Sequence, residues 1–265
     1  MQPLSFFRRS LVTRDGHSNQ PDVYTRLGVP TLINAKGPAT RLGGGIMAPE
    51  VADAMREATQ HCVDMATLQS HASDLIAGIT GAEAGIVTAG AAAAVLAGTA
   101  ACVAGMDPAC MSRLPDVRGM KDEVVVVRSQ RNFYDHAVRA VGVRLVEVGL
   151  ADRYAGSGVR DAEPWEIADA LSERTACVYY MAHPRSRPPL ADVVRVAHAA
   201  GIPVLLDAAA QLPPAENLRH FLDLGADLVA FSGGKAIGGP QGSGILCGRR
   251  DLVASAALQT LDMDL

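Results

Sequence analysis

The chain has 265 residues, a formal net charge of −4 and 49% hydrophobic residues. This composition supplies a large buried core and excludes a disordered chain, while the acidic balance argues against a broad nucleic-acid-binding surface. The five cysteines are scattered without a C-x-x-C pair, which disfavours a zinc site or a disulfide framework and is typical of the reducing cytoplasm.

The first 32 residues carry Arg8 and Arg9 without an apolar run behind them, so we expect no secretory signal. We interpret residues 1–32 as an N-terminal arm with a short helix over 21–27. Further helices are predicted over 49–62 and 71–80. The most apolar long stretch, 91–104, is shorter than the roughly 20 residues that a membrane span needs, so it predicts a buried helix packed on a sheet.

Short apolar runs alternate with helical patterns through the rest of the chain. Strands are predicted over 85–88, 123–128, 144–148, 176–181, 203–207, 227–231 and 243–247, and helices over 91–104, 135–141, 164–172, 190–200 and 215–224. Runs such as VVVV lack polar alternation, which indicates strands buried on both faces. The sequence therefore predicts an α/β fold with a mostly parallel seven-stranded sheet and helices on both faces.

Two polar residues follow consecutive predicted strands. Asp207 ends the strand 203–207, and Lys235 lies in the glycine-rich segment SGGKAIGGPQGSG after the strand 227–231. Taken alone, Asp207 is slightly better explained as the cap of a helix or turn, and Lys235 can be a solvated residue of a flexible loop. A right-handed crossover places both at one edge of the sheet. A Schiff-base lysine and an aspartate against a pyridinium nitrogen are the signature of pyridoxal 5'-phosphate (PLP) enzymes.

A turn of small residues at 88–92 offers a place for the cofactor phosphate. The free backbone N–H groups of this turn, at the start of a helix, are suited to an anion, although the same residues also suit a plain tight turn. Ser232, before the lysine loop, is a candidate donor to the same phosphate.

Polar residues after two other strands are candidates for the rest of the site. Gln130 or Arg131 can cover the cofactor ring by planar stacking, or both can be exposed loop residues. His183 is a candidate partner of the PLP phenolic oxygen, although a lone histidine is more often structural. Arg185 is a candidate for binding a substrate carboxylate or phosphate.

Four segments resemble the fold-type-I PLP family that contains bacterial L-seryl-tRNA(Sec) selenium transferase and D-glucosaminate-6-phosphate ammonia-lyase. They are INAKGPATRLGGGIMAPEVADAM (33–55), TGAEAGIVTAGAAAAVLAG (80–98), GIPVLLDAAAQLPP (201–214) and GADLVAFSGGKAIGGPQGSGIL (225–246). The resemblance implies that Lys235 forms the Schiff base and that Asp207 faces the pyridinium. It places Gly90, Ala91 and Ser232 in the phosphate cup, and it implies a homodimer or a higher assembly. Within TRLGGG, Arg41 is a candidate substrate ligand.

The segments TRLGGG and DAAAQLPP are more similar to the ammonia-lyase branch. That branch implies α,β-elimination on a small amino acid or amino-sugar acid, with Lys235 removing the α-proton before a β-hydroxyl and then ammonia leave. No strong cluster of Lys and Arg is present, so we do not expect a tRNA partner. A selenium transferase-like transferase, a racemase and a truncated non-catalytic PLP-binding remnant remain alternatives.

The chain departs from the family pattern at both ends. Lys36-Gly37-Pro38 stands where the family has a small residue and glycine after INA. The family continues into a small C-terminal domain, whereas the large domain here spans 33–250 and only 251–265 would begin the next domain. We expect 251–265 to form a helix without a partner for its apolar face (Leu252, Ala256, Leu258, Leu261), and the chain to bind PLP weakly with little activity.

Overall fold

The chain divides into two compact units, residues 1–37 and 38–265, and the computed structural model describes residues 21–150 and 161–260 of them. The described part of the first unit holds one helical turn, α1 (Val23–Arg26). The carboxylate of Asp22 caps this turn by accepting from the backbone N–H groups of Tyr24 and Thr25. The second unit carries the sheet and the pocket.

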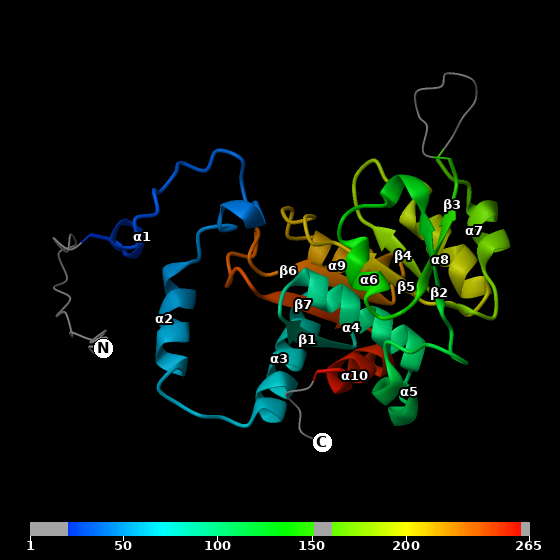
Figure 1. Cartoon of the computed structure of the whole chain (residues 1–265), viewed down its shortest axis with the longest axis horizontal. Helices are drawn as coiled ribbons and strands as arrows, with labels where there is room; N and C mark the ends of the chain where they lie inside the picture. Colours follow the sequence, from blue (N-terminus) through cyan, green and yellow to red (C-terminus); the bar gives the residue numbers. More distant parts are fainter. Residues whose placement is uncertain (1–20, 151–160, 261–265) are drawn as a thin grey trace, which may run out of the picture. The chain divides into compact units, whose positions relative to one another are not determined.

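The second unit is built on a seven-stranded sheet with the order β1-β7-β6-β5-β4-β2-β3 (Figure 1). All pairings are parallel except those of β7, which runs antiparallel to both β6 and β1. The prediction of a mostly parallel seven-stranded sheet is confirmed, with strand ends displaced by at most one residue. The strands are β1 (Ala84–Thr88), β2 (Glu123–Val127), β3 (Arg144–Val148), β4 (Thr175–Met181), β5 (Val204–Asp207), β6 (Leu228–Ser232) and β7 (Gly244–Gly248).

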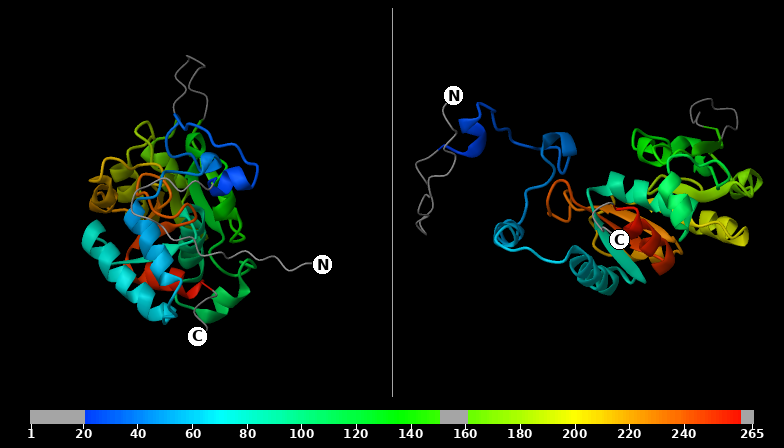
Figure 2. Two further views of the ribbon diagram at one scale, coloured as in Figure 1. Left: turned by 90° about the vertical axis from the view of Figure 1, so that its left-hand side faces the viewer. Right: turned by 60° about the horizontal axis from the view of Figure 1, so that its bottom comes forward.

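Helices cover both faces of this sheet (Figures 1 and 2). Helices α4, α6 and α10 pack on one face, with α5 against α4, and helices α3, α7, α8 and α9 pack on the other. Helix α2 buries none of its side chains. The helices are α2 (Pro49–Ala58), α3 (Met65–Thr80), α4 (Ala91–Ala104), α5 (Pro108–Arg113), α6 (Asp135–Arg139), α7 (Pro164–Ala170), α8 (Leu190–Ala199), α9 (Asn217–Asp223) and α10 (Arg250–Leu258), with 3-10 turns at Thr40–Leu42 and Arg128–Gln130.

Helix α4 is the central helix of its face. Its sequence, AAAAVLAGTAACVA, has no polar stripe, and most of its residues are buried against the strands and α10. Small side chains on every side let the helix lie between two layers at close packing distance. The prediction of a buried core helix is confirmed, and no helix in the described part of the chain is long and apolar enough to cross a membrane.

Helix α10 corrects one expectation. It does have a partner, because it packs against α4, β1 and β7 (Figure 2). Leu252 and Ala256 of the predicted apolar face are buried, Leu258 is partly exposed, and Leu261 lies outside the described residues. The hydroxyl of Ser255 also donates to the carbonyl of Gly105 at the end of α4. Helix α4 and strands β1 and β7 supply the apolar surface that this helix needs.

Buried charges at the amino edge of the sheet bind its elements together. The Asp227 carboxylate, before β6, accepts from His198 Nε2 and the Val204 N–H at 2.8 Å each and from Arg249 at 3.3 Å. The Glu123 carboxylate, at the start of β2, pairs with Arg144 at 2.6 Å. The pocket lies at the opposite, carboxyl edge of the sheet.

Candidate functional site

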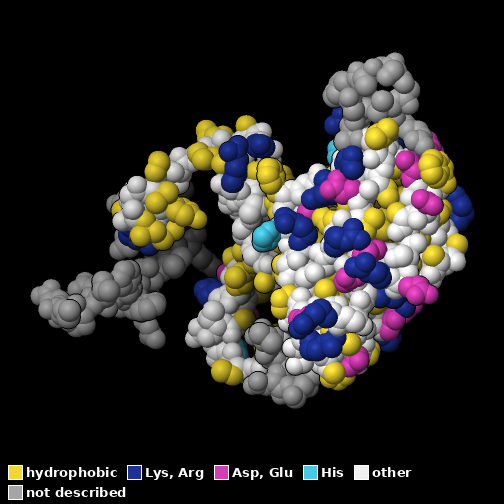
Figure 3. Space-filling model, turned by 45° about the vertical axis from the view of Figure 1, so that its right-hand side comes forward, with side chains coloured by type: hydrophobic (Ala, Val, Ile, Leu, Met, Phe, Trp, Pro, Cys, Tyr) yellow, Lys and Arg dark blue, Asp and Glu magenta, His cyan; other side chains and the backbone are white. Residues whose placement is uncertain are grey.

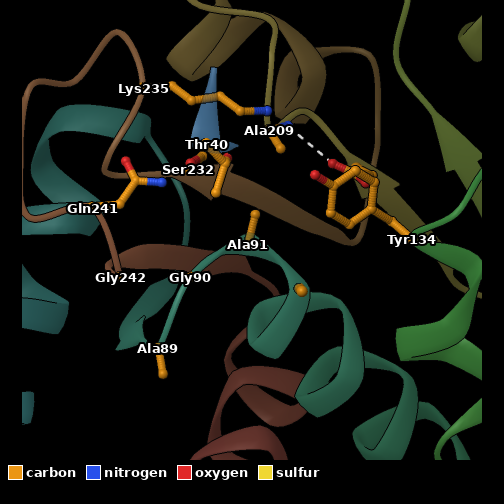
Figure 4. Close-up of a pocket in the computed structure, with 12 residues that line it drawn as sticks. Thr40, Ala89, Gly90, Ala91, Tyr134, Ala209, Ser232, Lys235, Gln241 and Gly242 are labelled. Carbon is orange, nitrogen blue, oxygen red and sulfur yellow. Dashed lines mark hydrogen bonds between the residues drawn. The ribbon is translucent and has the colours of Figure 1, made fainter. Parts of the chain in front are cut away.

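A pocket of about 320 Å³ lies at the carboxyl edge of β5 and β6 (Figure 4). It brings together segments that are far apart in the sequence: the turn after β1, the start of α6, the end of β5 and the loop between β6 and β7. The lining residues are Thr40, Ala89, Gly90, Ala91, Ala92, Tyr134, Asp207, Ala209, Ser232, Lys235, Gln241 and Gly242. Five of the predicted site residues, Lys235, Asp207, Gly90, Ala91 and Ser232, therefore share one cavity.

Asp207 is the last residue of β5, and its side chain is 9% exposed. One carboxylate oxygen accepts from the Ala209 N–H at 2.9 Å and the other from the Tyr179 hydroxyl at 3.0 Å. Burial raises the pKa of Asp207, while these two donors and the positive charge of Lys235 act in the opposite direction. The residue is thus a desolvated carboxylate whose charge depends on a few specific neighbours.

Lys235 lies on the loop that joins antiparallel strands β6 and β7. The two stems of this loop are paired, because Ser232 faces Gly244 in the ladder and the Gly233 N–H donates to the Ser243 carbonyl at 2.9 Å. The Gly45 N–H donates to the Gly234 carbonyl at 3.0 Å. The Lys235 side chain is half-buried and points into the pocket toward Ala209 (Figure 4). Among the described residues it forms no ion pair or hydrogen bond, so its amine is available to a ligand.

The N-terminus of α4 forms another wall of the pocket. Gly90 is its N-cap with φ +94°, a conformation that favours glycine, and no side chain caps the helix. The first helical N–H groups, from Ala91 onward, have no acceptor among the described residues and can bind an anion. Gly244 of β7 is pressed against this turn, because a Cβ there would lie 2.4 Å from the Gly90 carbonyl carbon.

Gln130 and Arg131 are not among the residues that line the pocket, and their place over a cofactor ring stays a prediction. The buried Gln130 amide accepts from the Met181 N–H at 3.0 Å and donates to the Arg187 carbonyl at 3.2 Å, which ties β2 to the segment after β4. The Arg131 guanidinium is held by Asp135 and Glu147. Both side chains are thus bonded to residues that do not line the pocket.

Three further candidates also lie outside the pocket lining. His183 lines a separate surface hollow, and its Nδ1 accepts from the Arg185 N–H at 3.1 Å. Arg185 is exposed. Arg41 is exposed on the 3-10 turn Thr40–Leu42, directly after the pocket residue Thr40. Of these three, Arg41 alone is adjacent in sequence to a pocket residue.

Thr40, Tyr134 and Gln241 are pocket residues that the sequence analysis did not single out. The Tyr134 ring points into the pocket from the start of α6 (Figure 4). Tyr134 lines the cavity although it is 54% exposed, whereas its neighbour Phe133 is fully exposed and does not line it. Gln241 lies in the glycine-rich segment. The density of glycines there predicts a closely packed loop but does not identify any individual side chain.

Comparison with known proteins identifies the family of this chain. The model of the L-seryl-tRNA selenium transferase family matches residues 32–264. The chain belongs to this family. A curated relative, D-glucosaminate-6-phosphate ammonia lyase of Salmonella typhimurium, is 34% identical over 90% of this chain and 63% of its own length. The 5'-C-glycyluridine monooxygenase-decarboxylase of a Streptomyces species is 36% identical over 89% of this chain and 58% of its own length.

Other members and solved structures agree with this assignment. An L-seryl-tRNA(Sec) selenium transferase of Rhizobium meliloti is 33% identical over 88% of this chain and 52% of its own length. The solved structure of a D-glucosaminate-6-phosphate ammonia-lyase superposes with a TM-score of 0.82 over 90% of this chain and 63% of the other. The chain thus spans less than two thirds of the length of these relatives. A PLP-dependent protein from Escherichia coli, 19% identical with a TM-score of 0.52, shares the fold.

The family and the fold indicate PLP as the cofactor, and the pocket fits it. A lysine amine, a buried carboxylate and a helix N-terminus line one cavity, and within residues 21–150 and 161–260 the amine has no ion pair and the first N–H groups of the helix have no acceptor. These are the groups suited to the aldehyde, the ring nitrogen and the phosphate. When bound, PLP supplies an electron-withdrawing ring that stabilises negative charge at a substrate carbon.

Proposed function

We propose that the protein is a PLP-dependent lyase that acts by α,β-elimination on a small amino acid or amino-sugar acid. The observation that carries this proposal is the convergence of Lys235, Asp207 and the α4 N-terminus in one pocket. The 34% identity to an ammonia lyase over 90% of the chain supports the reaction class.

Each part of the pocket has a role in this proposal. The Lys235 amine anchors the cofactor aldehyde and then moves the proton at the substrate α-carbon. Asp207 faces the ring nitrogen. The N–H groups at Ala91 and Ala92, with the Ser232 hydroxyl, bind the phosphate beside Gly90, whose own N–H donates to the Thr88 carbonyl at 2.8 Å. Tyr134 takes the ring-covering place that the sequence analysis gave to Gln130 or Arg131. Arg41, next to Thr40 at the pocket, is the proposed ligand of a substrate anion.

A second reaction class has its own support. The relative with 36% identity is a monooxygenase-decarboxylase whose name indicates a glycyl-nucleoside, so an amine substrate is common to both candidates while the bond that breaks differs. A seryl-tRNA substrate has less support, because Lys and Arg side chains are interspersed with carboxylates on the face in Figure 3 and the chain carries a net charge of −4. A non-catalytic PLP-binding remnant is the remaining alternative.

We also propose that the protein is a homodimer or a higher assembly in the cytoplasm. Helix α3 leaves Leu68, Leu75 and Ile79 exposed by 49%, 69% and 60%, which is a row of apolar side chains suited to a second copy. All five cysteines are free, as in a reducing compartment. Light scattering of the cofactor-bound chain at micromolar concentration tests the assembly, and a monomer would refute it.

The cofactor proposal is tested by titrating the purified chain with PLP and reducing the product with borohydride. We expect a visible absorbance band and a stable label on the Lys235 peptide in mass spectrometry, with neither in Lys235→Ala. A chain that stays colourless and unlabelled would refute the proposed site.

The reaction class is tested on the PLP-bound chain with D-glucosaminate 6-phosphate and with a panel of β-hydroxy amino acids. Ammonia release that Lys235→Ala abolishes supports the lyase. Carbon dioxide release with oxygen uptake from a glycyl-nucleoside supports the monooxygenase-decarboxylase class. PLP binding without any turnover supports the non-catalytic remnant, and a gel shift with seryl-tRNA at 150 mM salt supports the transferase.

A further inference from the structure

Strand β4 carries two adjacent tyrosines whose hydroxyl groups have different partners. Tyr179 and Tyr180 are both buried, with 0% and 5% of their surface exposed. Because side chains alternate along a strand, Tyr179 belongs to the core on the α4 face and Tyr180 to the core on the opposite face. The Tyr179 hydroxyl donates to Asp207, and the Tyr180 hydroxyl donates to the Pro188 carbonyl.

The register of the sheet explains why Tyr179 reaches Asp207. In the parallel ladder, Tyr179 pairs with Leu205 on β5, and Asp207 lies two residues further toward the carboxyl edge on the same face. Diagonal neighbours of this kind are about 7–8 Å apart, a gap that a long aromatic side chain spans. The 3.0 Å bond therefore comes from the strand pairing and does not depend on a loop.

In this hydrogen bond the Tyr179 phenol is the donor and the Asp207 carboxylate is the acceptor. Burial raises the pKa of the Tyr179 phenol, and the negative charges of Asp207 and Asp135 raise it further, so the phenol keeps its proton and acts as a donor. Asp207 is deeply buried, and the Ala209 N–H is the second donor to its carboxylate. Donors of this kind stabilise the charged form of a carboxylate that burial would otherwise leave neutral.

We propose that Tyr179 is a positioning residue of the cofactor site: its hydroxyl holds the Asp207 carboxylate charged and oriented toward the pocket, where it receives the protonated ring nitrogen of PLP. This inference rests on the proposed cofactor site. Tyr179 itself does not line the pocket, so it acts on the cofactor through Asp207.

The test compares Tyr179→Phe with Tyr180→Phe as a matched control, since each removes one buried hydroxyl and one hydrogen bond from the same strand. The 265-residue chain is titrated calorimetrically with PLP and with its carbocyclic analogue, in which a CH group replaces the ring nitrogen. Because a hydrogen bond to a charged group is worth more than a neutral one, we expect Tyr179→Phe to weaken PLP about tenfold and the analogue little. Tyr180→Phe should leave the ratio of the two affinities unchanged.

The results distinguish a positioning role of Tyr179 from a purely structural one. Equal weakening of PLP and the analogue in Tyr179→Phe, or no weakening of either, would overturn the proposal. Failure of Tyr179→Phe to fold while Tyr180→Phe folds would also overturn it, because the hydroxyl would then serve the core. If the wild-type chain bound no PLP, the proposed cofactor site would fall, and this inference with it. In an Asp207→Asn background, Tyr179→Phe should have no further effect on PLP affinity, and a further tenfold loss there would refute the coupling.

Discussion

Replacing Gly244 by alanine tests the wall between β7 and the N-terminus of α4. The added Cβ would lie 2.4 Å from the Gly90 carbonyl carbon and 2.7 Å from the Ala91 nitrogen. Ordinary contact begins near 3.4 Å, so the α4 turn must move away from β7 by about 1 Å. The atoms that must move belong to backbone, which cannot swing aside as a flexible side chain can.

A displacement of this size acts on two measurable quantities. Overpacking of a buried site costs about 1–3 kcal/mol of unfolding free energy. Binding sites tolerate shifts of only about 0.5 Å, so we expect PLP affinity to fall at least about tenfold. Urea unfolding gives the first quantity, and PLP titration at a temperature where the variant is fully folded gives the second.

Gly78→Ala is the matched control, because a Cβ on that residue of α3 meets no atom within 4 Å. It should leave PLP affinity unchanged. If Gly244→Ala bound PLP as tightly as the wild type while its folding was weakened, the assignment of this turn to the cofactor phosphate would be refuted.

Two further outcomes are expected from the fold. Burial raises the pKa of Asp207 above its value in the unfolded chain, so its favourable contribution is complete at low pH and is lost as the pH rises through the folded-state pKa. The melting temperature of PLP-free Asp207→Asn should therefore gain on that of the wild type as the pH rises from about 4, near the ordinary pKa of aspartate, to pH 8. A difference that stays constant or shrinks over this range would contradict the reasoning. Leu252→Ala should cost about 2–5 kcal/mol in urea unfolding, since this α10 side chain is 8% exposed, whereas Leu258→Ala at 37% exposed should cost at most about 1 kcal/mol. Equal costs would mean that α10 is not docked as the structure has it.

The strands were predictable because their apolar runs are short, uninterrupted and buried on both faces. Val124 to Val127, for example, form the centre of β2 with almost no exposed surface. Helix α5 was not predicted, since its six residues bury no side chain and give no periodic signal. The docking of α10 was also missed, because sequence periodicity identifies an apolar face but not the surface that receives it.

The two residues with the strongest chemical signal, Asp207 and Lys235, were placed in one pocket by topology alone. The topology does not constrain the other polar candidates, and most of them lie outside the pocket lining. Residue type alone makes Arg131 a candidate for ring stacking, but its guanidinium is bonded to Asp135 and Glu147, which lie 4 and 16 residues further along the chain. Tyr134 was missed because nothing in its sequence neighbourhood distinguishes it from the exposed Phe133.

The antiparallel direction of β7 has a consequence for how the lysine loop moves. Strand β6 ends and strand β7 begins at the same edge of the sheet, so the loop between them is closed by the β6–β7 ladder. On its other side, β7 pairs with β1. Opening the loop at its stem then requires breaking pairs inside the sheet, which happens only in large unfolding events. The amide of Gly233, bonded to Ser243 at the stem, should exchange its hydrogen with solvent at the slow rate of the core strands. Lys235 thus follows, two residues on, a stem that opens no more readily than the core strands.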